Sequence, residues 1–279
     1  MFREVRFEVL GPVRGWHGEI ELELGSPQQR AVLAMLLLAR GRQVSLGALI
    51  DGLWGADMPR SAAVTIRTYV SRLRRLVNTK AAGEAGQLIG SIGDGYVLRP
   101  ASAVLDLDVF EQWLSEGRAA RGHHDAARGA RLLRDALGLW HGVALAGVPG
   151  PYADSRRVPL TELHTAATEE KLAADIALGE NAMAIAELRA LLADHPFREG
   201  LSELLMLALY KSGRQAEALD VFDSMRHRLG GELGIDPGPS LQTMHQRILR
   251  ADRHLVDGAD LRPARLTRPM GAMGASMVA

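Results

Sequence analysis

Hydrophobic and polar residues alternate with a period of two at the start of the chain. Val5, Phe7 and Val9 fall on one face, and after Gly11 and Pro12 a second alternating run occupies residues 19–24. In that run Ile20, Leu22 and Leu24 oppose three glutamates. Successive side chains of a strand point to opposite faces. The pattern predicts a small antiparallel sheet with one face buried and one exposed.

Three segments with helical spacing follow this sheet. Ser26 and Pro27 have the residue types of a helix N-cap and first helical position, and the helix they begin ends before Gly41. Ser45 is the predicted cap of a shorter second helix, which is followed by a turn up to Pro59. The third helix is predicted from Ser61 to about Val77. Its apolar residues recur every three or four positions, at Ala62, Ile66, Tyr69, Val70, Leu73 and Val77.

A hairpin is predicted after the third helix. Two short apolar runs flank Gly93, Asp94 and Gly95, and Asp-Gly between such runs is a strong hairpin signal. The order of strands, three helices and a hairpin is that of a winged helix. We therefore predict a winged-helix domain at residues 1–100, of mixed helix and strand.

Strand signals cease after Leu105, and the rest of the chain is predicted to be helical. The expected helices are 106–121, 124–141, 155–179, 182–194, 198–212, 215–229 and 237–254. We place the domain boundary near Pro100, so that the all-helical domain covers 101–255. Residues 256–279 mix Pro, Gly, Ala, Met and Arg without periodicity and are expected to be a disordered tail.

A local repeat lies within the helical part. Gly179, Ala184 and Leu188 recur 34 residues later as Gly213, Ala218 and Phe222. This is the period of tetratricopeptide repeats. An ordinary helical bundle with coincidental spacing remains the alternative. Both architectures offer helical grooves to a protein partner.

Composition narrows the functional classes. With 47% hydrophobic and 24% charged residues the chain has the balance of a soluble globular protein, and no apolar stretch approaches the length of a membrane span. The N-terminus lacks the features of a secretory signal. The chain has no cysteine, which excludes disulfides, thiolate zinc sites and cysteine nucleophiles. We expect a cytoplasmic protein without membrane contact.

Charge is unevenly distributed although the net charge is zero. Residues 1–100 contain 13 basic against 9 acidic residues, and the rest of the chain contains 20 against 24. The segment from Ser61 to Lys80 contains five basic residues and no acid. Such a stripe suits the phosphate backbone of a nucleic acid. A solvated basic helix face is the alternative.

The third helix carries the residue types that read DNA. Arginine bonds guanine or phosphate, threonine bonds phosphate or contacts a thymine methyl, and serine permits close approach. The groove-facing candidates are Arg67, Thr68, Ser71, Arg72 and Arg75. Arg74 lies on the flank and is expected to contact the DNA backbone or to form an internal ion pair. Arg99 is a weaker candidate in the wing, because Asp94 at the tip would be repelled by phosphate.

Enzymatic chemistry is not expected. The chain lacks the phosphate-binding, dinucleotide-binding, zinc-protease and serine-hydrolase motifs. His123, His124 and Asp125 form the nearest approach to a metal cluster, but adjacent residues on a helix diverge by about 100°. A solvated helix start explains them better. We expect no cofactor and no metal.

Several long segments resemble the Streptomyces antibiotic regulatory protein family, whose members join an OmpR-type winged helix to a bacterial transcriptional activation domain. The resemblance covers roughly residues 5–255 and is most specific at 24–41, 53–77, 93–98 and 195–249. It implies that the third helix enters the major groove of direct repeats in promoters of secondary-metabolism genes. It also implies recruitment of RNA polymerase, with the turn Trp54, Gly55, Ala56 and Asp57 as a polymerase contact. Larger relatives continue into further domains, so this chain resembles a small member or the N-terminal part of a large one.

The resulting hypothesis is a sequence-specific activator of antibiotic biosynthesis genes. It would bind double-stranded promoter DNA as a head-to-tail dimer and contact the sigma and alpha subunits of RNA polymerase holoenzyme. Half-sites are then expected about 10 to 11 base pairs apart. A repressor using the same DNA face, and a protein-interaction module whose winged helix is only a scaffold, remain alternatives.

Overall fold

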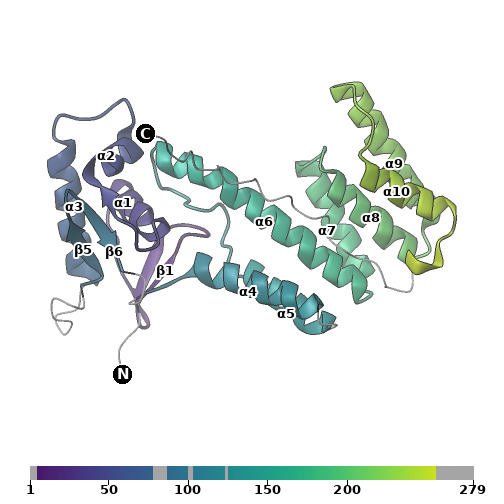
Figure 1. Ribbon diagram of the computed structural model, residues 1–279, viewed down its shortest axis with the longest axis horizontal. Helices are drawn as coiled ribbons and strands as arrows, with labels where there is room; N and C mark the ends of the chain where they lie inside the picture. Colours follow the sequence, from purple (N-terminus) through teal and green to yellow (C-terminus); the bar gives the residue numbers. More distant parts are fainter. Residues whose placement is uncertain (1–4, 78–86, 100–102, 123–124, 256–279) are drawn as a thin grey trace, which may run out of the picture. The chain divides into compact units, whose positions relative to one another are not determined.

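The computed structural model describes residues 5–77, 87–99, 103–122 and 125–255. The chain divides into two compact units, Met1–Ala174 and Asp175–Ala279, and the division falls within one long helix. Each unit is described by itself. Figure 1 labels their helices and main strands.

The first unit begins with a four-stranded sheet. Its strands are β1 (Val5–Glu8), β2 (Arg14–His17), β3 (Ile20–Glu21) and β7 (Ala103–Leu105), in the order β3-β2-β1-β7. β1 pairs antiparallel with β2 and parallel with β7.

The structure confirms the predicted burial of the first strand. It corrects the predicted position of the second strand. Val5, Phe7 and Val9 are buried as expected. The second strand was predicted at 19–24, but the chain pairs with β1 earlier, through β2, and Ile20 is 60% exposed. The residues of β2, Arg-Gly-Trp-His, show no apolar alternation, so their strand conformation depends on pairing with β1.

The three helices of the winged helix form where the capping residues predict. Ser26 Oγ accepts from the backbone N–H of Gln29 (3.3 Å) at the start of α1 (Pro27–Leu38). Ser45 Oγ accepts from the N–H of Ala48 (3.1 Å) at the start of α2 (Leu46–Trp54). α3 spans Ala62–Val77, and its apolar stripe is buried except for the half-buried Tyr69.

The predicted hairpin forms the wing. β5 (Ile89–Ile92) and β6 (Gly95–Leu98) pair antiparallel around a two-residue turn, in which Gly93 has a φ of +55°. A short third strand, β4 (Val44–Ser45), pairs with β6 on its other side. The winged-helix fold class is thereby confirmed.

Gly95 is the residue at which the wing is most sensitive to substitution. A Cβ at this position would lie 2.2 Å from the carbonyl oxygen of Val44 and 2.8 Å from Ser45 Cα. Both are backbone atoms, which cannot move without breaking the pairing of β4 with β6. We expect Gly95→Ala to lower the free energy of unfolding by about 3 kcal/mol.

Urea denaturation of the two single variants Gly95→Ala and Gly47→Ala measures this difference. Gly47 lies in α2, where a Cβ would have only Ser45 Oγ near it, at 3.9 Å. Gly47→Ala should therefore stabilise the chain by roughly 0.5 to 1 kcal/mol, as helix propensity requires. Equal midpoints for Gly95→Ala and the unmodified chain would disprove the close approach of β4.

The unit that contains the winged helix also contains three helices of the following segment. They are α4 (Asp106–Gly122), α5 (Ala126–Leu137) and the part of α6 (Pro151–Ala177) up to Ala174. β7 joins the first sheet, and the loop before α6 forms hydrogen bonds with the residues that follow β1. In this loop the N–H groups of His141, Leu145 and Ala146 donate to the carbonyls of Leu10, Val9 and Gly11.

The first compact unit therefore extends well beyond the boundary predicted near Pro100. The physical reason is that these pairings join segments more than 90 residues apart in sequence, which local patterns do not encode. The limits 1–100, 101–255 and 256–279 stay a prediction, and the tail 256–279 lies outside the described residues.

The second unit is built from helix pairs. Its helices are α7 (Asn181–Asp194), α8 (Glu199–Lys211), α9 (Gln215–Arg228) and α10 (Pro239–Leu249), with a π-helical turn at Leu229–Leu233 and a 3-10 turn at Arg253–Leu255. The mostly helical fold class with a helical second part is confirmed. None of the described helices is both long and apolar enough to cross a bilayer.

The 34-residue repeat corresponds to equivalent positions in this unit. Gly179 and Gly213 have positive φ values, of 86° and 74°, and each precedes a helix by two residues. The equivalent pairs Ala184 and Ala218, and Leu188 and Phe222, are buried. The repeat is therefore structural and not coincidental. The helix pair α9 and α10 departs from the repeat only after α9, where the π-helical turn lengthens the connection to α10.

Candidate nucleic-acid interface

The outward face of α3 carries the five groove-facing candidates. All five side chains are exposed: Arg67, Thr68, Ser71, Arg72 and Arg75. The opposite stripe, which includes Ile66, Val70 and Leu73, is buried in the core. The predicted orientation of α3 is confirmed, whereas contact with DNA stays a prediction.

Packing fixes the direction in which this face points. The hydroxyl of Tyr69 donates to Gln28 Oε1 of α1 (2.7 Å), so α3 is held to α1 by a polar contact as well as by its apolar stripe. Among the described residues, no carboxylate forms an ion pair with Arg67, Arg72 or Arg75. Three cations on one helix face are therefore left to an external anion or to solvent.

One further residue belongs to this face and was not predicted from the sequence. Val64 is 63% exposed although it is apolar. Val64 lies three residues before Arg67, so the helical period alone places it on the same stripe. An exposed apolar side chain on such a face suits the methyl group of thymine.

The hydroxyl of Thr68 is already used within the helix. It donates to the carbonyl of Val64 (2.9 Å), as helical threonines often do. Because this donor is used, Thr68 can contact an external partner only through its oxygen lone pairs and its methyl group. Contact with a base donor or a thymine methyl fits this geometry better than donation to a phosphate.

A hollow of about 370 Å³ lies beside the C-terminal half of α3. Arg72 and Arg75 form one side, and the turn before α1, with Gly25 and Ser26, forms the other. Glu23 also lines it, so its electrostatic character is mixed. The arginines nevertheless line a surface wide enough for a phosphate group.

Arg74 does not point outward. Its Nε donates to the carbonyl of Ile89 (3.0 Å), its Nη2 donates to Ser91 Oγ (2.7 Å), and its guanidinium lies over the ring of Tyr96 (5.5 Å). The expected internal ion pair is corrected, because the acceptors are a carbonyl and a hydroxyl, whereas the expected contact with the DNA backbone stays a prediction. The contacts are internal, but they join α3 to the wing and involve no carboxylate.

Arg99 and Asp94 lie at opposite ends of the wing. Arg99 donates to the carbonyl of Gln87 (2.9 Å) at the base of the hairpin, away from its tip. Asp94 lies at the tip, where its carbonyl accepts from the N–H of Leu46 and its carboxylate accepts from Gln43. The tip is thus held against the start of α2. Arg99 as a DNA contact stays a prediction, and this placement adds nothing to it.

The turn between α2 and α3 contains the predicted polymerase contact. Gly55 ends α2 with a φ of +55°, and the N–H of Asp57 donates to the carbonyl of Trp54 (3.0 Å). Trp54 packs against the core, so Ala56 and Asp57 are the residues of the turn that are exposed. Contact with polymerase remains untested by this geometry.

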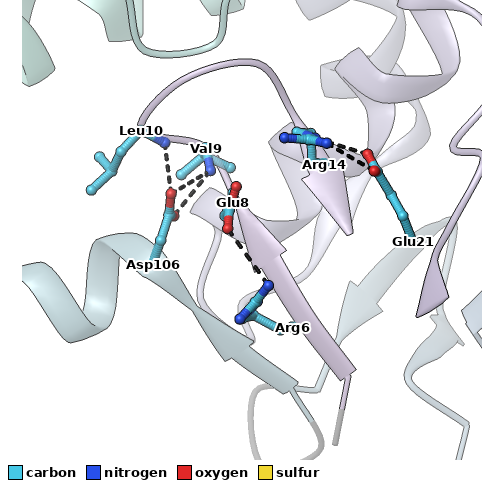
Figure 2. Close-up of polar contacts among 7 residues, drawn as sticks. All are labelled: Arg6, Glu8, Val9, Leu10, Arg14, Glu21 and Asp106. Carbon is cyan, nitrogen blue, oxygen red and sulfur yellow. Dashed lines mark hydrogen bonds and ion pairs between the residues drawn. The ribbon is translucent and has the colours of Figure 1, made fainter. Parts of the chain in front are cut away.

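A buried carboxylate joins the winged helix to α4. Asp106 accepts from the backbone N–H groups of Val9 (2.9 Å) and Leu10 (2.9 Å), as Figure 2 shows, and from that of Leu107 (2.7 Å). Burial raises the pKa of Asp106 to about 6, and the three N–H groups oppose this shift. On the same sheet, Arg14–Glu21 is an exposed ion pair of small energetic weight, and Arg6 pairs with the partly buried Glu8.

The expectations of no metal and no cofactor stay predictions. Within the ranges that the structure describes, no three metal-ligating side chains gather at one place. His123 and His124 lie outside those ranges, while Asp125 accepts from the N–H of Arg128 (3.0 Å) as the N-cap of α5.

Comparison with protein families divides the chain in the order seen in the fold. Residues 19–98 match the family model described as "Transcriptional regulatory protein, C terminal", and residues 105–249 match "Bacterial transcriptional activator domain". The first match contains α1, α2, α3 and the wing. The second begins next to Asp106 and ends with α10.

Individual proteins resemble nearly the whole chain. The regulatory protein AfsR of Streptomyces griseus is 48% identical over 270 residues, which are 94% of this chain and 27% of AfsR. The regulatory protein DnrI of Streptomyces peucetius is 35% identical over 255 residues, covering 89% of this chain and 93% of DnrI. This chain therefore spans about a quarter of AfsR and nearly all of DnrI.

A solved structure shares the fold. The structure described as "Mycobacterium tuberculosis EmbR in complex with low affinity phosphopeptide" superposes with a TM-score of 0.82 at 34% identity. The match covers 89% of this chain and 65% of the EmbR chain. Both the winged helix and the helical part thus have a counterpart in one experimentally studied chain.

Proposed function

Because this chain belongs to the Streptomyces antibiotic regulatory protein family of transcriptional regulators, we propose that it is a sequence-specific transcriptional activator of antibiotic biosynthesis genes. It acts in the cytoplasm by binding promoter DNA and not by catalysis. α3 enters the major groove, and the helical part contacts protein.

The observation that carries the DNA-binding proposal is the exposed face of α3. Arg67, Arg72 and Arg75 lie on a rigid helix and have no carboxylate partner among the described residues. Thr68, Ser71 and Val64 lie between them and add short polar and apolar groups. Cations without internal partners supply phosphate and guanine contacts, and the shorter side chains allow the helix to approach the bases.

The protein partner is RNA polymerase holoenzyme, with its sigma and alpha subunits as the contacts. Two features support a protein partner. The turn Trp54–Asp57 presents Ala56 and Asp57 beside the DNA-facing helix. In the second unit a hollow of about 480 Å³ between α7, α8 and α9 is lined by charged side chains and by apolar ones, which include Leu205, Val221 and Met225. Grooves between helices of this kind accommodate protein segments.

On DNA we place two copies head to tail on direct repeats. Recognition helices of adjacent copies then lie on one face of the duplex, so half-sites should be spaced by about 10 to 11 base pairs. A footprint with two protected segments at this spacing would support the arrangement, and inverted half-sites would contradict it.

A salt-titrated gel shift tests the proposal directly. The purified chain is mixed with promoter fragments from its own gene cluster, with and without RNA polymerase holoenzyme. We expect tight binding that weakens steeply with salt, as counterion release requires, and that strengthens when polymerase is present.

Other outcomes would decide between the alternatives. Tight binding that excludes polymerase would make the chain a repressor with the same DNA face. Failure to bind any of these promoters, together with salt-insensitive capture of a protein, would leave the helical hollow of the second unit as the functional site.

A further inference from the structure

Arg74 is the one arginine in the C-terminal half of α3 that contacts the wing. Arg72 and Arg75 flank it in sequence and are exposed, whereas Arg74 turns toward β5 and is partly buried. Figure 1 shows β5 and β6 beside α3, and Arg74 bridges these elements. Its role in DNA binding must therefore differ from that of its neighbours.

The geometry points to Arg74 as a positioning residue that sets the wing relative to α3. This inference rests on the proposed DNA-binding function and deepens it. With α3 in the major groove, as proposed, the position of the wing relative to α3 decides whether the wing can also contact the same site. A residue that joins them controls that position without contacting DNA itself.

Three contacts carry the inference. Nε and Nη2 of Arg74 donate to two acceptors on β5, the carbonyl of Ile89 (3.0 Å) and the hydroxyl of Ser91 (2.7 Å). Ser91 and Tyr96 are cross-strand partners in the hairpin, and the guanidinium lies 5.5 Å from the centre of the Tyr96 ring. Arg74 thus contacts both strands of the wing.

The chemistry of arginine explains why this residue type stands here. A guanidinium is planar and rigid, so two of its N–H groups can bond two acceptors at once while its face stacks on an aromatic ring. Lysine carries the same charge but is a flexible point donor that cannot hold both positions. Charge and positioning can therefore be separated by one substitution.

The wing has no other side-chain bond to α3 among the described residues. Further polar ties run to the segment before α2 and to its first residue: Gln43 Nε2 donates to the carbonyl of Ile92 (2.9 Å), the N–H of Leu46 donates to the carbonyl of Asp94 (3.3 Å), and β4 pairs with β6. These ties hold the tip and one edge of the hairpin. At the β5 edge, Arg74 supplies the side-chain hydrogen bonds that join β5 to α3 within the described part of the chain.

The test compares Arg74→Lys and Arg74→Ala in the full chain, with Arg72→Lys as the matched control. Binding to a promoter fragment shifted by the unmodified chain is measured over a range of salt concentrations. We expect Arg74→Lys to bind about as weakly as Arg74→Ala, each at least roughly tenfold weaker than the unmodified chain. Arg72→Lys should retain more affinity, because a lysine still pairs with phosphate.

A hydroxyl-radical footprint provides a readout that simple loss of stability would not move. In both Arg74 variants, protection at the flank contacted by the wing should disappear, whereas protection opposite α3 should persist at saturating protein. Full affinity of Arg74→Lys, or an intact footprint in both variants, would overturn the inference. Arg74 would then either contact DNA directly through its charge or be dispensable for DNA binding.

Amide hydrogen exchange keeps the inference independent of the proposed function. Without DNA, Arg74→Ala should raise exchange in residues 89–98 and leave α3 protected. If the unmodified chain bound no promoter DNA, the proposed function would fail. Unchanged exchange in the wing would contradict the positioning role itself.

Discussion

Replacing Arg72 and Arg75 together by alanine should reduce promoter binding roughly hundredfold at fixed salt. Both side chains are exposed on α3, and neither pairs with a carboxylate in the described part of the chain, so their positive charge is available to DNA. If both contact phosphates, the slope of log affinity against log salt should decrease by about two. The fold should be unaffected, because neither residue belongs to the buried stripe.

A second pair of arginines offers a matched control for this experiment. Arg128 and Arg131 are also exposed and three residues apart, but they lie on α5. Their double replacement by alanine removes the same charge and should leave promoter binding nearly unchanged. Equal losses from the two double variants would show a general effect of charge and would disprove the assignment of the DNA face to α3.

Replacing Asp106 by alanine should destabilise the first unit by about 3 to 5 kcal/mol. The backbone N–H groups of Val9 and Leu10 would lose their acceptor in a buried place, since both residues are fully buried. Each unsatisfied buried N–H costs about 1 to 3 kcal/mol. Urea denaturation followed by far-ultraviolet circular dichroism measures the loss.

An exposed aspartate provides the comparison for Asp106. Asp125 accepts one N–H bond as the N-cap of α5 (3.0 Å) but is exposed, so Asp125→Ala should cost only about 1 kcal/mol. If Asp106→Ala cost no more than Asp125→Ala, the carboxylate would not be what joins the winged helix to α4.

The pH dependence of Asp106 follows from the direction of its shift. Burial raises its pKa from 3.8 to about 6, with a smaller contribution from Glu8, so the folded chain binds more protons than the unfolded chain between these values. Stability contributed by this group therefore falls as pH rises from about 4 to 6 and is level above. Asp106→Asn should remove this slope, and an Asp106 carbon resonance that titrates near 4 would contradict the shift.

Much of the winged helix could be predicted because its determinants are local. Ser26 and Ser45 cap the helices that follow them, and the Gly93-Asp94 turn closes the hairpin. The stripe of α3 places five candidates outward because a rigid helix with one buried side has one exposed side. The same helical period places the apolar Val64 on this face, although its residue type alone would predict burial.

The parts that could not be predicted are non-local pairings. β2 has no apolar alternation and β7 lies beyond the expected boundary, yet both are strands because each pairs with β1. The helical period places Arg74 on the flank of α3 and Arg75 on the exposed face, but only the position of β5 shows which groups Arg74 bonds.

For this protein, the sequence by itself determined the helices, their caps, the hairpin, the 34-residue repeat and the basic face of α3, because each depends on residues close together in the chain. The tertiary structure alone decided how far the first unit extends, which arginine holds the wing, and that Asp106 is buried. These three features depend on groups that only the folded chain brings together. Asp106 and Val9, for example, are more than 90 residues apart in the sequence. Hydrogen bonds and burial at such separations are properties of the folded chain, and no local pattern encodes them.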